Sequence, residues 1–125
     1  MKTVAIAKAV SHSPRKVGVV VALVRGRTVA DALVILEHAP RRTAKVVADV
    51  IKSAAANAEH NNNVNPKTLR IDAIELGPGP RLKRFMPVSH GRAHPFMRRT
   101  TNIRVIVDGE VREIKKVAKT TEGKA

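Results

Sequence analysis

Residues 76–107 carry seven basic side chains and no acidic one, and this acid-free stretch limits what the chain can fold into. Without internal partners of opposite charge, the basic groups repel one another and favour an extended conformation until an anion neutralises them. Half of the net charge of +14 lies in this stretch. The seven basic residues are Arg81, Lys83, Arg84, Arg92, Arg98, Arg99 and Arg104. Such a field favours phosphate-rich partners.

The rest of the composition is that of one small domain with an aliphatic core. The chain has 125 residues, of which 43% are hydrophobic, but it has no Trp or Tyr and only two Phe. Sheets that bind RNA by stacking bases on many exposed aromatic residues are therefore excluded. The absence of cysteine excludes disulfides, thiolate metal sites and a catalytic thiol. No membrane-length apolar run or signal peptide is apparent, so the expected location is the cytoplasm.

Capping signals and helical spacing predict three helices before residue 62. Ser13-Pro14 precedes a valine-lined helix over residues 15–25, which Gly26 ends. Thr28 and Asp31 resemble a capping box for a second helix that stops at Pro40. A third, alanine-rich helix is predicted from residue 41 to about residue 60, and its small side chains allow close packing on a sheet.

Alternating apolar residues predict three strands. Residues 2–10 contain Val4, Ile6 and Val10 at even spacing, which indicates an amphipathic strand with these side chains on one face. Residues 68–77 alternate with a slip of phase at Ile74, which suggests a bulge. Residues 102–107 are the clearest strand, with Ile103, Val105 and Val107 on one face.

The segment between the last two strands, residues 78–100, has too few large apolar residues for a second core. A loop of this length in a compact domain is usually functional or disordered. We predict a long, irregular, basic hairpin with Ser89-His90-Gly91 near its tip. The predicted domain covers residues 1–107 and includes this hairpin, whereas residues 108–125 are a C-terminal extension. Within the extension, Asp108-Gly109 predicts a turn and residues 110–115 a short edge strand.

The basic residues are the candidate RNA ligands, because the planar guanidinium of arginine pairs two phosphate oxygens and stacks on bases. Besides the seven named above, we assign this role to Arg15, Lys16, Arg25 and Arg27, which bracket the first helix. Arg25 has the alternative role of complementing that helix's dipole. Asn57, inside the third helix, is either an RNA ligand or an internally hydrogen-bonded amide. Phe85 and Phe96 stack on bases, face open space or pack on each other.

Catalysis and metal binding have little support in the sequence. His90 and His94 are four residues apart, but Gly91 and Pro95 disfavour a helix that would present them together. Gly77-Pro78-Gly79-Pro80 is not a phosphate-binding loop, because its prolines lack the necessary N–H groups. No arrangement of a catalytic nucleophile or of paired carboxylates is present. We therefore predict no enzyme activity, no cofactor and no metal.

Several separated motifs, in order over residues 4–107, resemble the family of bacterial large-subunit ribosomal protein twenty-two. The motifs are Ser13-Pro14-Arg15-Lys16, Val24-Arg25-Gly26-Arg27, Ser53-Ala54-Ala55-Ala56-Asn57-Ala58-Glu59-His60-Asn61, Gly79-Pro80-Arg81-Leu82-Lys83-Arg84-Phe85-Met86-Pro87, Gly91-Arg92-Ala93 and Arg98-Arg99-Thr100. The resemblance implies an α+β fold of three helices packed on a small three-stranded antiparallel sheet, with a long protruding basic β-hairpin.

The same resemblance implies a non-enzymatic protein that binds large-subunit ribosomal RNA early in assembly. Its globular part would lie near the outer opening of the peptide exit tunnel, beside neighbouring large-subunit proteins, and its hairpin would line the tunnel wall past which the nascent chain moves. The implied tunnel-lining residues are Phe85, Met86, Pro87, Val88, Ser89, His90 and Gly91.

Two other function classes remain alternatives at this point. An architectural DNA-binding protein could use basic ribbon arms with a proline wedge to bend a duplex, but it would need a dimer with a helical interface. An exported cationic protein is disfavoured because the sequence lacks a signal peptide and has a substantial core.

Overall fold

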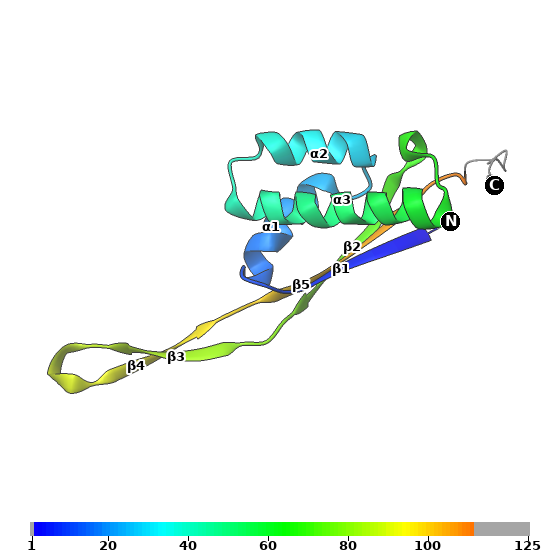
Figure 1. The fold of residues 1–125 in the computed structure, drawn as a ribbon. Coiled ribbons are helices and arrows are strands. Elements are labelled where there is room, and N and C mark those ends of the chain that lie inside the picture. Colours follow the sequence, from blue (N-terminus) through cyan, green and yellow to red (C-terminus); the bar gives the residue numbers. More distant parts are fainter. Residues whose placement is uncertain (1, 112–125) are drawn as a thin grey trace, which may run out of the picture.

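The structure is a computed structural model, and it describes residues 2–111. In chain order its elements are β1 (Lys2–Val10), α1 (Pro14–Val24), α2 (Val29–His38), α3 (Arg42–Asn62), the 3-10 turn η1 (Pro66–Thr68), β2 (Arg70–Pro78), β3 (Leu82–Pro87), the 3-10 turn η2 (Ser89–Gly91), β4 (Ala93–Arg98) and β5 (Thr101–Asp108). The three helices gather against one side of the sheet, and the β3–β4 hairpin extends far away from them (Figure 1). The predicted α+β class is confirmed.

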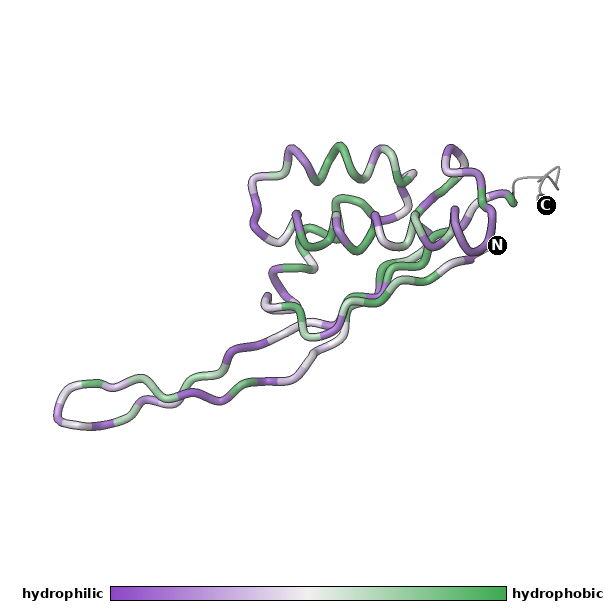
Figure 2. The backbone as a smooth tube through the Cα atoms, in the orientation of Figure 1, coloured by the Kyte–Doolittle hydropathy of each residue, from purple (hydrophilic) through white to green (hydrophobic). Residues whose placement is uncertain are grey.

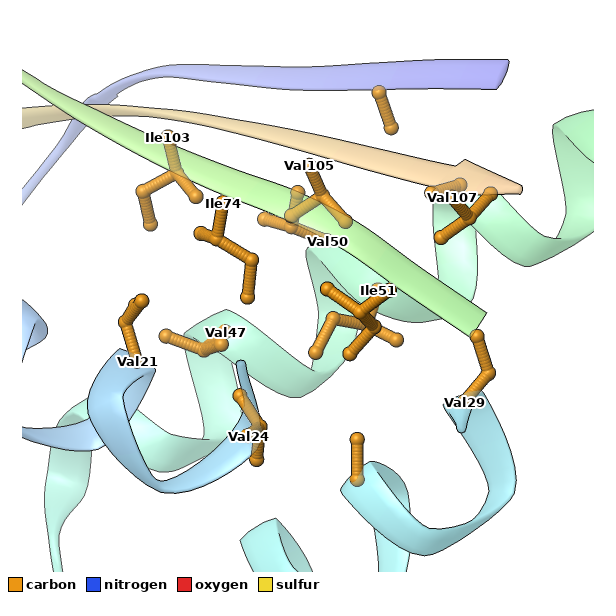
Figure 3. Close-up of a cluster of buried hydrophobic side chains, with 14 of the residues drawn as sticks. Val21, Val24, Val29, Val47, Val50, Ile51, Ile74, Ile103, Val105 and Val107 are labelled. Atoms are coloured by element: carbon orange, nitrogen blue, oxygen red, sulfur yellow. The ribbon is translucent and has the colours of Figure 1, made fainter. Parts of the chain in front are cut away.

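The sheet has the strand order β1-β5-β2, and both pairings are antiparallel. The central strand β5 alternates as predicted, and Ile103, Val105 and Val107 are fully buried. Their side chains point toward the helices, where they meet Val47 and Ile51 of α3 (Figure 3). This aliphatic layer is the core of the domain.

The inward face of β1 differs from the prediction. Thr3 and Ala5 are buried, whereas Ile6 is 56% exposed. The reason is that β1 packs against the alanine-rich side of α3, where Ala54 and Ala58 are buried. Small residues on both elements let the helix approach the strand closely, so the larger side chains Val4 and Ile6 of β1 turn to the outer face.

The predicted caps define the helices. The Ser13 hydroxyl accepts the N–H of Lys16 at 3.4 Å, and the Thr28 hydroxyl accepts the N–H of Asp31 at 3.3 Å. Gly26 follows α1 with a φ of 74°, in the left-handed region that favours glycine. The helix α3 continues two residues beyond the predicted end, to Asn62, and stops where Asn63 adopts a left-handed conformation.

The chain between α1 and α2 covers the outer edge of β2. Val29 N–H donates to the Leu69 carbonyl at 3.1 Å, and Ile71 N–H donates to the Arg27 carbonyl at 2.9 Å. These bonds satisfy backbone groups that an open sheet edge would expose. The predicted bulge of β2 is confirmed, and it lies between Ile71 and Ala73.

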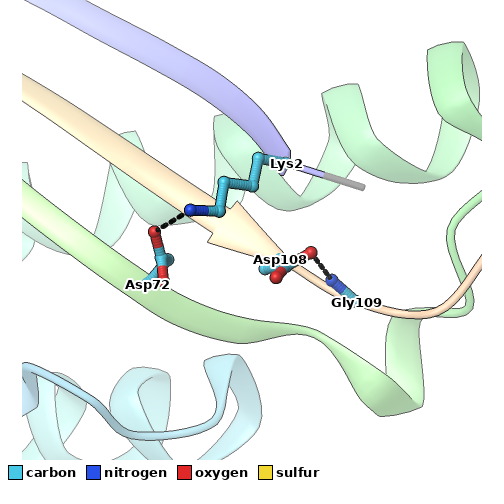
Figure 4. A network of polar contacts seen from close by, with 4 residues as sticks. All are labelled: Lys2, Asp72, Asp108 and Gly109. Carbon is cyan, nitrogen blue, oxygen red and sulfur yellow. Dashed lines mark hydrogen bonds and ion pairs between the residues drawn. The ribbon is translucent and has the colours of Figure 1, made fainter.

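An ion pair connects the two outer strands of the sheet. The ammonium of Lys2 in β1 lies 3.2 Å from a carboxylate oxygen of Asp72 in β2 (Figure 4). Both side chains are well exposed, so the pair contributes little to stability at ordinary salt. The sheet is therefore held together by its backbone ladders and the aliphatic layer.

The hairpin is more regular than predicted. Its strands pair without interruption from Leu82 opposite Arg98 to Pro87 opposite Ala93, and a bond from Val88 N–H to the Arg92 carbonyl, 2.9 Å, closes the tip. Short hydrophobic and hydrophilic segments follow one another along it (Figure 2). The tip is at residues 89–91, as predicted, where His90 and Gly91 have positive φ.

The positions of the prolines explain why the ladder is not interrupted. Opposed residues in an antiparallel pair alternate between positions that exchange hydrogen bonds and positions that do not. The bonded pair of Val88 and Arg92 makes the pairs containing Pro87 and Pro95 non-bonded ones. A proline at a non-bonded position removes no hydrogen bond from the ladder.

Residues 109–111, the described residues after β5, do not fold back along that strand, although the sequence predicts that they do. The Asp108 carboxylate accepts the N–H of Gly109 at 2.9 Å (Figure 4). The chain then meets the loop that follows α3, where Asn65 N–H donates to the Glu110 carbonyl at 2.9 Å and Val64 bridges Val111. The rest of the predicted edge strand, residues 112–115, lies outside the described residues.

Gly79 marks the root of the hairpin and supplies a test of how the hairpin is anchored. Its N–H donates to the Thr100 carbonyl at 2.9 Å, and the Thr100 hydroxyl donates to the Pro80 carbonyl at 2.6 Å. A Cβ at Gly79 would collide with that hydroxyl. We expect Gly79→Ala to lower the free energy of unfolding, measured by urea denaturation, by about 1–3 kcal/mol.

Gly77→Ala is the matched control, because no atom lies within 4 Å of the Cβ that it would add. We expect it to change the unfolding free energy by less than about 1 kcal/mol. Equal losses from the two variants would contradict the role given to the Gly79 and Thr100 contact.

Candidate nucleic-acid interface

The hairpin presents its positive charges to solvent. The side chains of its six basic residues are all exposed, and among residues 2–111 none of them forms an ion pair with an acidic side chain. The six are Arg81, Lys83, Arg84, Arg92, Arg98 and Arg99. Uncompensated cations at this density form a surface that attracts a polyanion.

The seventh residue of the acid-free stretch is placed differently. Arg104 lies on β5 and points to the outer face of the sheet, where its guanidinium contacts a carboxylate oxygen of Glu75 at 2.9 Å. Both side chains are about half exposed. Because an exposed pair of this kind is weak, Arg104 can exchange Glu75 for a phosphate at small cost.

A cleft at the base of the hairpin, which we call the root cleft, joins it to the helices. It has a volume of about 650 Å³, and Lys16, Arg42, Arg98 and Arg99 bring four positive charges to it. The remaining lining residues are Ser11, His12, Ser13, Leu82, Met97 and Thr100. A concave surface with this charge is suited to an anion such as a backbone phosphate.

The positive charges near the root cleft lie at helix N-termini, where they destabilise the helices that carry them. The helix α1 has Arg15 and Lys16 in its first turn, α3 begins at Arg42, and neither first turn contains an acid. The positive end of a helix dipole lies at the N-terminus, so a cation there costs about 0.3–1 kcal/mol. In α2 the charged residues are placed in the usual way for the helix dipole, with Asp31 in the first turn and His38 in the last. The cations of α1 and α3 therefore have no acidic partner in their own first turns.

Among the lining residues that sequence reasoning did not assign to a site, two have basic side chains, His12 and Arg42. For Arg42 a signal exists in the sequence, because Arg41-Arg42 follows Pro40 and opens a predicted helix with the wrong charge for its dipole. Of the pair predicted in the first turn of α1, Lys16 lines the cleft, whereas Arg15 is exposed beside it.

Arg25 and Arg27 have partners within the protein. The guanidinium of Arg25 donates to the Ile74 carbonyl on β2 at 3.1 Å, and that of Arg27 donates to the Leu23 carbonyl near the end of α1 at 3.0 Å. Arg25 lies at the C-cap of α1, so its alternative role of complementing the helix dipole also stays a prediction. RNA contact by these two residues stays a prediction.

Asn57 also has an internal partner. Its side-chain amide donates to the Val4 carbonyl on β1 at 3.4 Å, and the residue is half-buried between α3 and the strand. Of the two alternatives, the internally hydrogen-bonded amide is the one that the structure contains. A role for Asn57 in RNA binding stays a prediction.

The two phenylalanines lie on opposite faces of the hairpin. Phe85 is opposite Pro95, and Phe96 is opposite Arg84. Phe85 is 70% exposed, whereas Phe96 is half-buried and has the guanidinium carbon of Arg98 5.8 Å from its ring centroid. The alternative in which the two rings pack on each other is therefore wrong. All the residues predicted for the tip are exposed.

Within residues 2–111, no three His, Asp or Glu side chains come together as a metal site would need. No helix in that range is both long enough and apolar enough to cross a membrane.

Comparison with known proteins places this architecture in a family. The family model described as ribosomal protein L22p/L17e matches residues 5–108. A protein of Desulforamulus reducens, named large ribosomal subunit protein uL22, is 49% identical over 107 residues, which are 86% of this chain and 95% of that protein. Proteins of the same name from Clostridium perfringens and Clostridioides difficile are each 47% identical, over 86% of this chain and 96% of theirs.

The position of Arg42 in the root cleft predicts that one substitution changes protein stability and RNA affinity in opposite directions. Arg42→Gln removes a cation from the N-terminus of α3, so we expect the free energy of unfolding to rise by about 0.3–1 kcal/mol. We also expect weaker binding to an RNA stem-loop, with the slope of log K against log salt reduced by roughly 0.7–0.9, the value for one lost phosphate contact.

Arg41→Gln removes the same charge one residue earlier. Arg41 lines a different groove, between α2 and α3, so its loss is expected to affect RNA binding much less. An equal loss of RNA affinity in the two variants would show that the root cleft has no special part in binding.

Proposed function

Because this chain belongs to the ribosomal protein L22p/L17e family, we propose that it binds large-subunit ribosomal RNA through its hairpin and root cleft. We further propose that it joins the subunit early in assembly and that its hairpin lines the wall of the peptide exit tunnel. Family membership makes the chain a structural constituent of the large ribosomal subunit, found in the cytoplasm, and not an enzyme.

The observation that carries the RNA proposal is the set of exposed hairpin cations with no acidic partner among the described residues. Protein interiors and ordinary surfaces balance such charges with nearby acids, and this segment contains none. Phosphates of a folded RNA supply the missing counter-charge at high density. Release of the counterions condensed on the RNA then drives binding.

The shape of the hairpin supports a position in a narrow space. Each of its strands has six residues, which at about 3.3 Å per residue gives a ladder about 20 Å long and only two strands wide. A ribbon of this shape can enter between RNA helices where the globular part cannot. We place the exposed tip in the tunnel wall, where the nascent chain passes it, and the globular part beside neighbouring proteins near the tunnel exit. The proposed wall residues are Phe85, Met86, Pro87, Val88, Ser89, His90 and Gly91.

We also propose that residues 1–107 act as one RNA-binding domain, with residues 108–125 as its C-terminal extension. The valines of α1, Val17, Val20, Val21 and Val24, are all fully buried against the rest of the domain. That face is consequently not available for the helical dimer interface that an architectural DNA-binding protein would need.

Shortening the hairpin tests the proposal. A variant in which a short glycine-containing turn replaces residues 81–99 keeps the Gly79 and Thr100 contact at the root and loses six basic residues. If each of the six meets a phosphate, the slope of log K against log salt should become less steep by roughly 4 to 5 units. The measurement is equilibrium binding to deproteinised large-subunit ribosomal RNA at several salt concentrations.

Cosedimentation is the companion measurement. The full chain should travel with the large subunit through a high-salt gradient and should prefer ribosomal RNA to duplex DNA at the same salt. An unchanged salt slope in the shortened variant would mean that the hairpin is not an RNA-binding element, and equal affinity for duplex DNA would count against the ribosomal role.

A further inference from the structure

The two faces of the β3–β4 hairpin differ in chemistry. Side chains alternate between the faces of a strand, and directly opposed residues share a face, so the register assigns every side chain of the ladder to one side. One side, the arginine face, carries Leu82, Arg84, Met86, His94, Phe96 and Arg98. The other, the proline face, carries Lys83, Phe85, Pro87, Ala93, Pro95 and Met97.

The arginine face contains a cation–π pair. The Arg98 guanidinium lies over the Phe96 ring, 5.8 Å from its centroid, and Arg84 is directly opposite Phe96 on the neighbouring strand. These neighbours leave Phe96 half-buried, although it lies in a two-stranded ribbon with no core beneath it. A guanidinium over an aromatic ring is a favourable pair, which contributes modestly to stability at an exposed site.

The proline face has no comparable arrangement. Its aromatic residue, Phe85, is 70% exposed and lies opposite Pro95. Its only charge is Lys83, near the base, and the distal pairs of the face are uncharged. Within the ladder, two guanidinium groups lie on the arginine face and one ammonium lies on the proline face.

The arginine face is also continuous with the root cleft. Leu82 and Arg98 form the first pair of the ladder, and both line the cleft together with Lys16 and Arg42. Met97 of the proline face lines the cleft as well, but it brings no charge and no hydrogen-bond donor to it. One positive surface therefore runs from the helix N-termini through the root cleft to Arg98 of the arginine face.

We infer that the hairpin binds ribosomal RNA through its arginine face, with an unpaired nucleobase stacked on the Phe96–Arg98 pair and backbone phosphates held by Arg84 and the root cleft. This inference rests on the proposed RNA-binding function and specifies its geometry. The proline face, with Phe85, is turned away from the RNA.

A nucleobase is the kind of ligand that fits the Phe96–Arg98 pair. Every nucleobase has a π-face, which stacks on aromatic rings and on guanidinium groups, and single-stranded RNA offers unstacked bases for such contacts. Arginine adds phosphate pairing in the same geometry, which lysine does not provide. An unpaired base would thus pack on the Phe96–Arg98 pair as one further layer.

Two matched pairs of variants test the inference in the full-length chain, with deproteinised large-subunit ribosomal RNA as the probe. Phe96→Leu and Phe85→Leu each remove one ring, from opposite faces. Arg84→Gln and Lys83→Gln each remove one charge, again from opposite faces, at neighbouring positions. Circular dichroism before binding verifies that each variant is folded.

On the arginine face, we expect Phe96→Leu to reduce the affinity about fivefold or more, as the loss of one stacked base does. We expect Arg84→Gln to reduce the steepness of the salt dependence by roughly one contact. On the proline face, Phe85→Leu should change affinity less than about twofold, and Lys83→Gln should reduce the steepness of the salt dependence by less than Arg84→Gln does. Phe96→Tyr keeps an aromatic ring and should therefore keep the affinity. If Phe96 only packed the ribbon, the affinity would not depend on an aromatic ring at position 96 while being insensitive to the ring at position 85.

The outcomes separate this inference from the proposed function. Equal losses on the two faces, or greater losses on the proline face, would overturn the inference while RNA binding itself stands. An affinity unaffected by all four single-site variants would also overturn it and would place the binding outside the ladder. Failure of the unaltered chain to bind the RNA would overturn the proposed function, and the inference with it.

Discussion

The antiparallel pairing of β2 with β5 is the contact on which the rest of the structure depends. In the domain it places Ile103 and Val105 of β5 beneath the helices, where they are fully buried. At its far end the same two strands reach Pro78 opposite Thr101, continue through the Gly79 and Thr100 bond, and become the hairpin. The hairpin has no core of its own, so its direction is set by the last paired residues of the sheet.

A second constraint is that the chain does not neutralise its own charge. The hairpin lacks acids, and the first turns of α1 and α3 carry cations that oppose their helix dipoles. Each such cation costs a fraction of a kcal/mol, which the buried aliphatic layer must offset. If the protein binds RNA as proposed, the phosphates would supply the electrostatic stabilisation that most folded proteins gain internally.

Most of the architecture could be predicted from local signals, and the failures have specific physical reasons. The Ser13 and Thr28 caps and the alternation of β5 are properties of short segments, and they were confirmed. The prediction of which β1 side chains face the core was wrong, because that choice depends on the alanines of α3, which are distant in sequence. The hairpin cations follow from composition, but the meeting of Lys16, Arg42 and Arg98 in one cleft depends on three separate elements. No sequence window contains that information.

The hairpin prolines connect the register of the ladder to its chemistry. Pro87 and Pro95 occupy pairs that exchange no hydrogen bonds, so the observed register loses nothing to them. A slip of one residue turns one strand over and would move either Pro87 or Pro95 into a bonded pair, where the missing N–H interrupts the ladder. The same slip would place Arg84 opposite a proline or a methionine instead of Phe96, because neighbouring residues point to opposite faces. Residues that look like strand breakers in the sequence therefore favour the one register that gathers Arg84, Phe96 and Arg98 on a single face.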